Sequence, residues 1–113
     1  QLGNHEEAVD LLNKFKTKDL LVGAAKYSTL GDAYVEMGEL DKAIDAYKNG
    51  IEKYENNFSS PIILKKMGLV YEELGQLDNA LETYQNIEST YPETPEGKEI
   101  NKYIGRVESK LSL

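Results

Sequence analysis

Side chains that could perform acid–base, nucleophilic or metal chemistry are sparse in this sequence. There is one histidine, His5, and there is no cysteine. A zinc site needs several ligands in a fixed geometry, and a Ser–His–acid triad needs a histidine that other groups can surround. His5 stands near one end of the chain, so we interpret it as an exposed turn residue. The sequence therefore predicts no catalytic residue, no metal site and no bound cofactor.

Acidic residues stand in short groups, which is the arrangement that paired general acids and bases use. The groups are Glu6–Glu7, Glu72–Glu73, and Glu36 with Glu39 and Asp41. We expect them on helix surfaces and in turns, where such groups are solvated. The nine glycines are scattered singly, so neither a phosphate-binding loop nor a calcium loop is indicated. We conclude that the protein is not an enzyme.

Charge and composition exclude two further classes of partner. The 113 residues are 40% apolar and 29% charged, as is usual for one soluble globular domain. The net charge is −7, with 13 basic residues spread among 20 acidic ones. Nucleic acids and anionic lipids both need a concentrated basic surface. We therefore expect no nucleic-acid partner and no direct membrane contact, and no apolar run reaches the ~20 residues of a membrane helix.

The elements that would position any site form a repeat. Three segments share the order glycine, two residues, an acid, one residue, alanine. They begin at Gly3, Gly38 and Gly75, and their alanines are Ala8, Ala43 and Ala80. Successive alanines are 35 and 37 residues apart, close to the ~34-residue period of helix–turn–helix repeats.

A second pattern stands before two of these turns. It has an aromatic or leucine, then leucine or methionine, glycine, and tyrosine at fixed spacing: Tyr27, Leu30, Gly31 and Tyr34, and again Leu64, Met67, Gly68 and Tyr71. Tyr47 and Tyr84 follow the repeat alanines by four, and Pro92 closes the second unit. Together these residues resemble the signature of the tetratricopeptide repeat (TPR) family. The resemblance implies an all-α fold, a right-handed α-solenoid of antiparallel helix hairpins, in which helix A precedes helix B.

The repeats predict one domain over residues 1–113. It would contain a half repeat at 1–22, complete repeats at 24–57 and 61–94, and a C-terminal covering helix at 95–113. We expect helices near 4–15, 20–37, 41–55, 61–74, 78–91 and 95–111. The first three residues read like the tail of a helix whose body is missing, so we interpret the chain as a fragment of a longer one.

Small residues and capping residues give this reading a physical basis. Gly31 and Gly68 would let helix A approach helix B, opposite the small side chains of Ala43 and Ala80. Gly38 and Gly75 would take a left-handed conformation after helix A. For the helix starts we expect a capping box at Asn4 and Glu7, and hydroxyl caps before proline at Ser60–Pro61 and Thr94–Pro95.

The surface that such a fold makes is the candidate binding site. Helices A line the concave side of a solenoid. The inward positions are Ala25, Ser28, Asp32, Val35 and Glu36 in the first complete repeat, and Ile62, Lys65, Lys66, Leu69, Glu72 and Glu73 in the second. We expect this groove to bind a peptide or protein and to act as a scaffold. The alternative is that these residues are merely solvated.

Two other roles remain open. Val9, Leu12 and Phe15 would lie partly uncovered on a first helix that lacks a hairpin partner, and they could mediate homodimerisation. Chaperone-binding relatives clamp a partner's terminal carboxylate. Of the matching positions here, Ser28 and Asp32 depart from that pattern and Lys66 alone fits, which argues against this use.

Short stretches also resemble bacterial cell-envelope repeat proteins, which are similar to the ancillary subunit of the Sec translocon. The stretches are residues 57–61, Tyr91–Pro92 and residues 96–104. This resemblance implies a periplasmic, chaperone-like role beside the translocon, with a membrane anchor upstream of Gln1. We expect the envelope rather than the cytoplasm on this ground.

Overall fold

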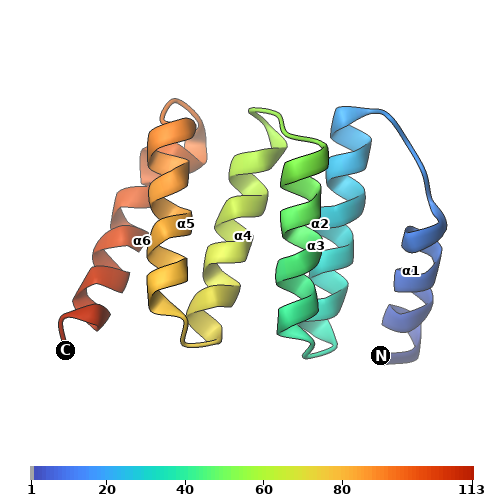
Figure 1. The fold of residues 1–113 in the computed structure, drawn as a ribbon, viewed down its shortest axis with the longest axis horizontal. Coiled ribbons are helices and arrows are strands. Elements are labelled where there is room, and N and C mark those ends of the chain that lie inside the picture. The colour runs from blue at the N-terminus through green and yellow to red at the C-terminus, as the bar shows by residue number, and fades with distance from the viewer. Residues whose placement is uncertain (1) are drawn as a thin grey trace. The chain divides into compact units, whose positions relative to one another are not determined.

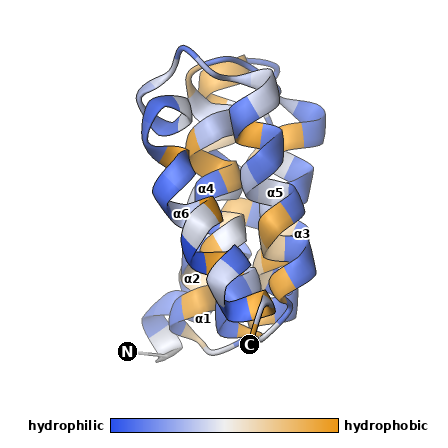
Figure 2. Cartoon of the chain, turned by 90° about the vertical axis from the view of Figure 1, so that its left-hand side faces the viewer, coloured by the Kyte–Doolittle hydropathy of each residue, from blue (hydrophilic) through white to orange (hydrophobic). Residues whose placement is uncertain are grey.

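The structure is a computed structural model that describes residues 2–113. Over these residues the chain forms six helices and is all-α, as expected (Figure 1). Their bounds are α1 Leu2–Lys14, α2 Leu20–Glu36, α3 Leu40–Lys53, α4 Ser59–Glu73, α5 Leu77–Thr90 and α6 Pro95–Leu111. Each bound lies within two residues of the predicted one. The helices pack in sequential pairs, and the hydropathy colouring shows polar and apolar residues alternating along them (Figure 2).

The chain divides into two compact units, residues 1–60 and 61–113. The first unit contains α1, α2 and α3. The second contains α4 from its third residue onward, with α5 and α6. The division falls at Pro61, where the sequence places the start of the second complete repeat.

The turns after α2 and α4 are built as the glycines predict. Gly38 and Gly75 both have φ of 75°, a left-handed conformation that costs glycine little. After α2 the N–H of Glu39 donates to the Tyr34 carbonyl at 2.9 Å, and the N–H of Gly38 donates to Val35 at 3.0 Å. These two bonds form a Schellman motif, and the turn at Gly75 repeats it.

The helix starts agree with the sequence at only one of the three expected caps. Thr94 precedes Pro95 and its hydroxyl accepts from the Gly97 N–H at 3.0 Å, as predicted. Asn4 lies inside α1, so its capping box is wrong, and His5 is helical instead of lying in a turn. The hydroxyl cap at Ser60 is also wrong, because α4 already begins at Ser59.

Two caps were missed. Before α4, the side chain of Asn56 accepts from the Phe58 and Ser59 N–H groups at 3.0 and 2.7 Å. The Ser60 hydroxyl accepts from the Asn56 N–H at 3.0 Å, which closes a reciprocal capping arrangement. Asp19 caps α2 by accepting from the Val22 N–H at 2.8 Å.

The core of the first unit joins all three of its helices. Val9 of α1, Leu30 and Ala33 of α2, and Ala46 of α3 form one buried cluster. Val9 is only 8% exposed, so α1 does have a packing partner, contrary to the expectation of an uncovered helix. The partly buried hydrophobic residues that pack against the cluster are Leu12, Tyr27, Tyr34 and Met37.

Glycines in helix A lie beneath tyrosine rings of helix B. A methyl group added to Gly31 would overlap the ring of Tyr47, and one on Gly68 would overlap the ring of Tyr84. The atoms nearest to the two glycines belong to these rings, and the repeat alanines Ala43 and Ala80 are both fully buried. A third pair, Gly23 and Tyr54, repeats the arrangement at the start of α2. An aromatic ring fills each of these three close approaches.

Candidate functional site

The predicted stripe on α2 is accessible in the first unit. Ala25, Asp32 and Glu36 are exposed, and Ser28 and Val35 are half-buried. The carboxylate of Asp32 accepts a hydrogen bond of 2.6 Å from the hydroxyl of Tyr47. Burial of the Tyr47 phenol and this hydrogen bond raise its pKa. Asp32 therefore contacts helix B as well as forming part of the surface.

The predicted stripe on α4 is accessible in the second unit. Leu69 is 42% exposed in the middle of the helix. Glu73 is exposed as well, and the remaining stripe residues, Ile62, Lys65, Lys66 and Glu72, are half-buried. The stripe thus carries an accessible leucine flanked by charged groups.

Two charged residues of this stripe are paired with α6. Lys65 forms an ion pair with Glu99. Seven residues further along both helices, Glu72 accepts from the Arg106 Nε at 3.1 Å. Glu72 also accepts from the ammonium of Lys110, four residues beyond Arg106, at 3.3 Å. The equal spacing shows that α4 and α6 run parallel here.

Tyr103 of α6 lies between these two ion pairs. Its ring centroid is 4.8 Å from the Lys65 ammonium and 4.9 Å from the Arg106 guanidinium. Lys102 stands 5.6 Å from the same ring, and the Tyr84 ring is 5.6 Å away between centroids. We define the α4–α6 face as Lys65, Leu69 and Glu72 of α4 with Glu99, Tyr103 and Arg106 of α6.

The α6 half of this face is absent from the residues predicted as a site. The spacing of Ile100, Tyr103, Ile104 and Val107 predicts a single apolar stripe on this covering helix. The three aliphatic residues are buried, but Tyr103 is only half-buried. The signal for a face was the spacing of Glu99, Tyr103 and Arg106 by four and three residues, which places them on one side of a helix.

Two comparisons bear on this arrangement. Two different family models, both described as tetratricopeptide repeat, match residues 24–57 and residues 66–94. Together they cover more than half of the chain. The chain belongs to the tetratricopeptide repeat family. Repeats of this family are non-catalytic and generally serve as protein-interaction scaffolds.

A comparison with curated proteins found no match. The resemblance to translocon-associated envelope repeat proteins therefore receives no support beyond the short stretches that suggested it. The location of this TPR protein in the cell envelope stays a prediction.

Glu72 of this TPR protein is held by side chains of two other helices, α5 and α6. Its side chain is 9% exposed and accepts bonds from Arg106, from Lys110, and from the Tyr84 hydroxyl at 2.5 Å. Burial alone would raise the pKa of this carboxyl, but the bonds from Arg106, Tyr84 and Lys110 outweigh burial and lower it. The expectation of a merely solvated Glu72 is therefore wrong. The bond to Glu99 stabilises the charged form of Lys65 in the same way and raises its pKa.

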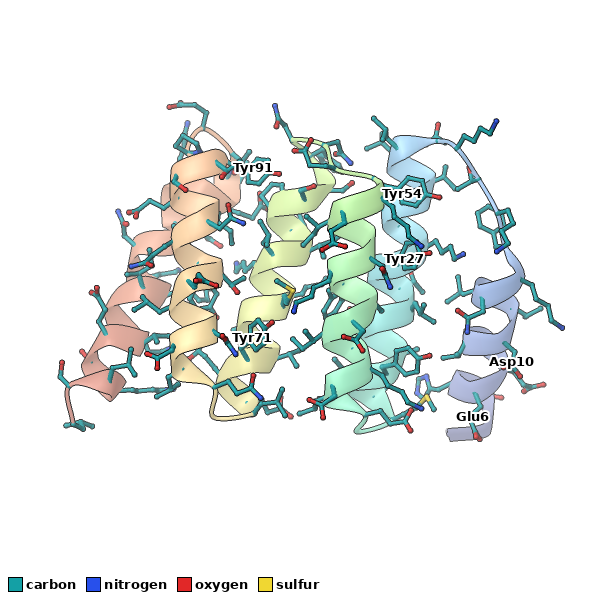
Figure 3. All side chains as sticks on the ribbon, in the orientation of Figure 1. Glu6, Asp10, Tyr27, Tyr54, Tyr71 and Tyr91 are labelled. Carbon is teal, nitrogen blue, oxygen red and sulfur yellow. The ribbon has the colours of Figure 1, made fainter. Side chains whose placement is uncertain are left out.

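The other acidic groups are on the surface. Glu6 and Glu7 are exposed on α1, where Figure 3 labels Glu6, and Glu36 and Asp41 flank the first turn. Among residues 2–113 no group of three or more histidine or acidic side chains is placed to hold a metal ion. Over the same residues, no helix combines the length and apolar character needed to cross a membrane.

The three residues predicted for self-association differ in how far they are buried. Val9 belongs to the core and Leu12 packs against it. Phe15 is 45% exposed at the end of α1, close in sequence to Leu11, which is 70% exposed. Leu11 on α1 and Phe15 just after it thus expose apolar surface, and Leu11 was not among the predicted residues.

Proposed function

We propose that this TPR protein binds a peptide or protein partner through its A-helix surfaces. In the first unit the surface is the α2 stripe, residues Ala25, Ser28, Asp32, Val35 and Glu36. In the second it is the α4–α6 face. The observation that carries the proposal is the accessible Leu69, which stands between two ion pairs that join α4 to α6.

The α4–α6 face has the composition of a small interaction surface. Protein interfaces combine an apolar or aromatic centre with a polar rim, and tyrosine and arginine are frequent among the residues that dominate binding energy. Here Leu69 and Tyr103 supply the centre. Lys65 and Arg106 flank Tyr103 and are themselves held by carboxylates. Because these side chains are already ordered by contacts within the chain, little conformational entropy is lost when a partner binds.

The test is selection of peptides from a random-peptide display library on the immobilised chain. Selected peptides should lose about tenfold or more in affinity for Leu69→Glu, measured by calorimetry, because a charge would stand at the centre of the surface. Leu111→Glu is the matched control, since Leu111 is also 42% exposed and also lies in the second unit. Failure to enrich peptides, or equal binding by Leu69→Glu and wild type, would contradict the proposal.

The first unit is tested separately with Ala25→Glu. Ala25 is exposed on α2 and lies outside the core cluster, so the variant should fold. If the α2 stripe contributes, peptides selected on wild type should bind this variant more weakly. If only Leu69→Glu weakens them, binding involves the second unit alone.

Self-association is the second candidate function, because Leu11 and Phe15 expose apolar surface on α1. A dimer through α1 should show a mass that rises with concentration in sedimentation equilibrium. The double variant Leu11→Glu and Phe15→Glu should then remain a monomer. A wild-type chain whose mass stays that of a monomer at every concentration would rule this candidate out.

A further inference from the structure

The first unit contains an open surface pocket of about 400 Å³ that the proposed function does not use. It lies between α1 and α3, over α2. Its lining from α2 is Tyr27, Leu30 and Tyr34. These residues lie on the side of α2 opposite Ala25, Asp32 and Glu36, because about 100° of rotation separates successive helix positions. We call it the α1–α3 pocket.

The pocket has an apolar floor and aromatic side chains beside it, and both are held in place. Leu30 and Ala46 form the floor, and both belong to the core cluster, with 4% and 3% exposure. Tyr27 and Tyr34 line the pocket and pack against the same cluster. A pocket supported by a packed core is largely formed before any ligand arrives, which reduces the entropy lost on binding.

Tyr27 is further restrained from its outer side. Its hydroxyl accepts a hydrogen bond of 3.2 Å from the Lys53 ammonium. Its ring lies 6.0 Å from the Tyr54 ring between centroids, with 33° between their planes, and both side chains are labelled in Figure 3. The wall therefore does not need to be ordered by a ligand.

The rim of the pocket carries amide groups on two different helices. Asn13 of α1 and Asn49 of α3 both line it. Within residues 2–113 neither side-chain amide has a hydrogen-bond partner in the protein. Each amide offers one acceptor oxygen and two N–H donors, which complement the N–H and C=O of a peptide group. Lys42 and Asp45 also stand at the rim with opposite charges, so the rim favours neither an anion nor a cation.

The asparagine amides at the rim favour an extended ligand over a helical one. In a helical ligand the backbone N–H and C=O groups are already paired within the helix, so they could not bond to the asparagines. In an extended segment these groups are free beside each side chain. A volume of about 400 Å³ lies within the range of binding pockets and accommodates a large apolar side chain with its adjoining peptide groups.

We propose that the α1–α3 pocket is a second peptide-binding site, which takes one large apolar or aromatic side chain of an extended segment. Asn13 and Asn49 bond the peptide groups on either side of that side chain. This site is independent of the A-helix surfaces, because it shares no residue with them and lies on the opposite side of α2.

The test is a nuclear magnetic resonance titration of the ¹⁵N-labelled chain with short blocked peptides. The probes are acetyl-Gly-Leu-Gly-amide and acetyl-Gly-Tyr-Gly-amide, and acetyl-Gly-Gly-Gly-amide is the control without a side chain. We expect saturable shifts of the Ala46 backbone amide and of the Asn49 side-chain amide with the leucine or tyrosine probe only. No saturable shift up to the solubility of the probes, or an equal response to the glycine control, would overturn the proposal.

Variants locate the binding. Asn49→Ala should weaken binding of the responsive probe about tenfold, the effect expected from losing one or two hydrogen bonds. Asn101→Ala is the matched control, because Asn101 is an exposed asparagine on α6, and it should bind as wild type does. Equal affinity of Asn49→Ala and wild type would contradict the proposed role of the rim. The dispersion of the amide spectrum shows that each variant is folded.

A third variant separates this inference from the proposed function. Leu69→Glu removes the centre of the α4–α6 face and should leave the probe titration unchanged. If Leu69→Glu abolishes the shifts at Ala46 and Asn49, the probes bind through the second unit and the pocket proposal is wrong. If peptide selection fails while the titration succeeds, the A-helix proposal fails and the pocket proposal stands.

Discussion

Tyr47 and Tyr84 of helix B each make two kinds of contact with helix A. The ring of Tyr47 covers Gly31, and its hydroxyl donates to Asp32, the residue that follows that glycine. The ring of Tyr84 covers Gly68 in the same way, and its hydroxyl donates to Glu72, one helical turn further along. Each tyrosine thus joins the two helices of its repeat through packing and through a polar bond to the A-helix surface.

The same glycine-to-alanine change should have opposite effects on stability at Gly31, which lies beneath the Tyr47 ring, and at Gly105, which has open space beside it. Gly31→Ala should destabilise the protein by about 1–3 kcal/mol, because the added methyl group overlaps a fully buried ring. Gly105→Ala should stabilise it by about 0.5–1 kcal/mol, because Gly105 lies in α6 with open space beside it and alanine favours the helix. Urea unfolding of both variants measures the two free energies. Equal effects would contradict the ring contact.

Glu72 gives a prediction about acid stability. Its pKa in the folded chain is held below the usual value near 4.5, so the unfolded chain binds more protons in that pH window. The stabilisation is therefore present above pH 4.5 and is lost as the pH falls through the folded pKa. Wild type should lose more stability than Glu72→Gln on acidification, by about 1 kcal/mol, since the paired Arg106 is partly exposed. Urea unfolding at a series of pH values measures the difference, and parallel pH profiles would contradict it.

At the scale of the helices, ends set by glycine were predicted better than ends set by polar side chains. Gly38 and Gly75 need a left-handed backbone, a requirement that few other residues satisfy, so their positions identified both turns. Polar caps are ambiguous, because serine, asparagine and aspartate occur in many places. Asn4 and Ser60 matched a capping pattern but lie within helices, whereas Asp19 and Asn56 cap α2 and α4.

The difference between Asp19 and Asn4 can be measured. Asp19→Ala should destabilise the protein by about 0.5–2 kcal/mol, because the Val22 N–H loses the carboxylate that accepts its bond. Asn4→Ala should be neutral or slightly stabilising, since Asn4 lies inside α1 and alanine has the higher helix propensity. Urea unfolding of the pair provides the test. A larger loss for Asn4→Ala than for Asp19→Ala would restore the capping box that the sequence suggested.

At the scale of the whole molecule, the α1–α3 pocket and the α4–α6 face share no residue and lie in different units. A chain that carries both Asn49→Ala and Leu69→Glu should therefore bind the blocked-peptide probe as weakly as Asn49→Ala alone does. It should bind library-selected peptides as weakly as Leu69→Glu alone does. Effects at independent sites add within about 0.5 kcal/mol. Calorimetry on the four chains gives the comparison. A double variant whose loss for either ligand departs from that of the relevant single variant would indicate coupling between the sites.

The sequence by itself determined the family, the class of fold and the position of every helix within two residues. Tetratricopeptide repeats are defined by local spacing, and the periodicity of apolar residues, the turn glycines and the repeat alanines are all local signals. The accessible positions of Leu69 and Glu73 on α4 could be predicted for the same reason, because the side on which a helical residue lies follows from its position along the chain.

Only the tertiary structure decided which groups meet. Tyr103 was assigned to the apolar side of a covering helix, and its place between Lys65 and Arg106 depends on the packing of α6 beside α4. The α1–α3 pocket likewise needs Asn13 and Asn49, which are 36 residues apart, to stand on one rim. Spacing along one helix determines which side a residue occupies, but contacts between helices depend on how whole side chains pack, and a single sequence does not contain that information in local form.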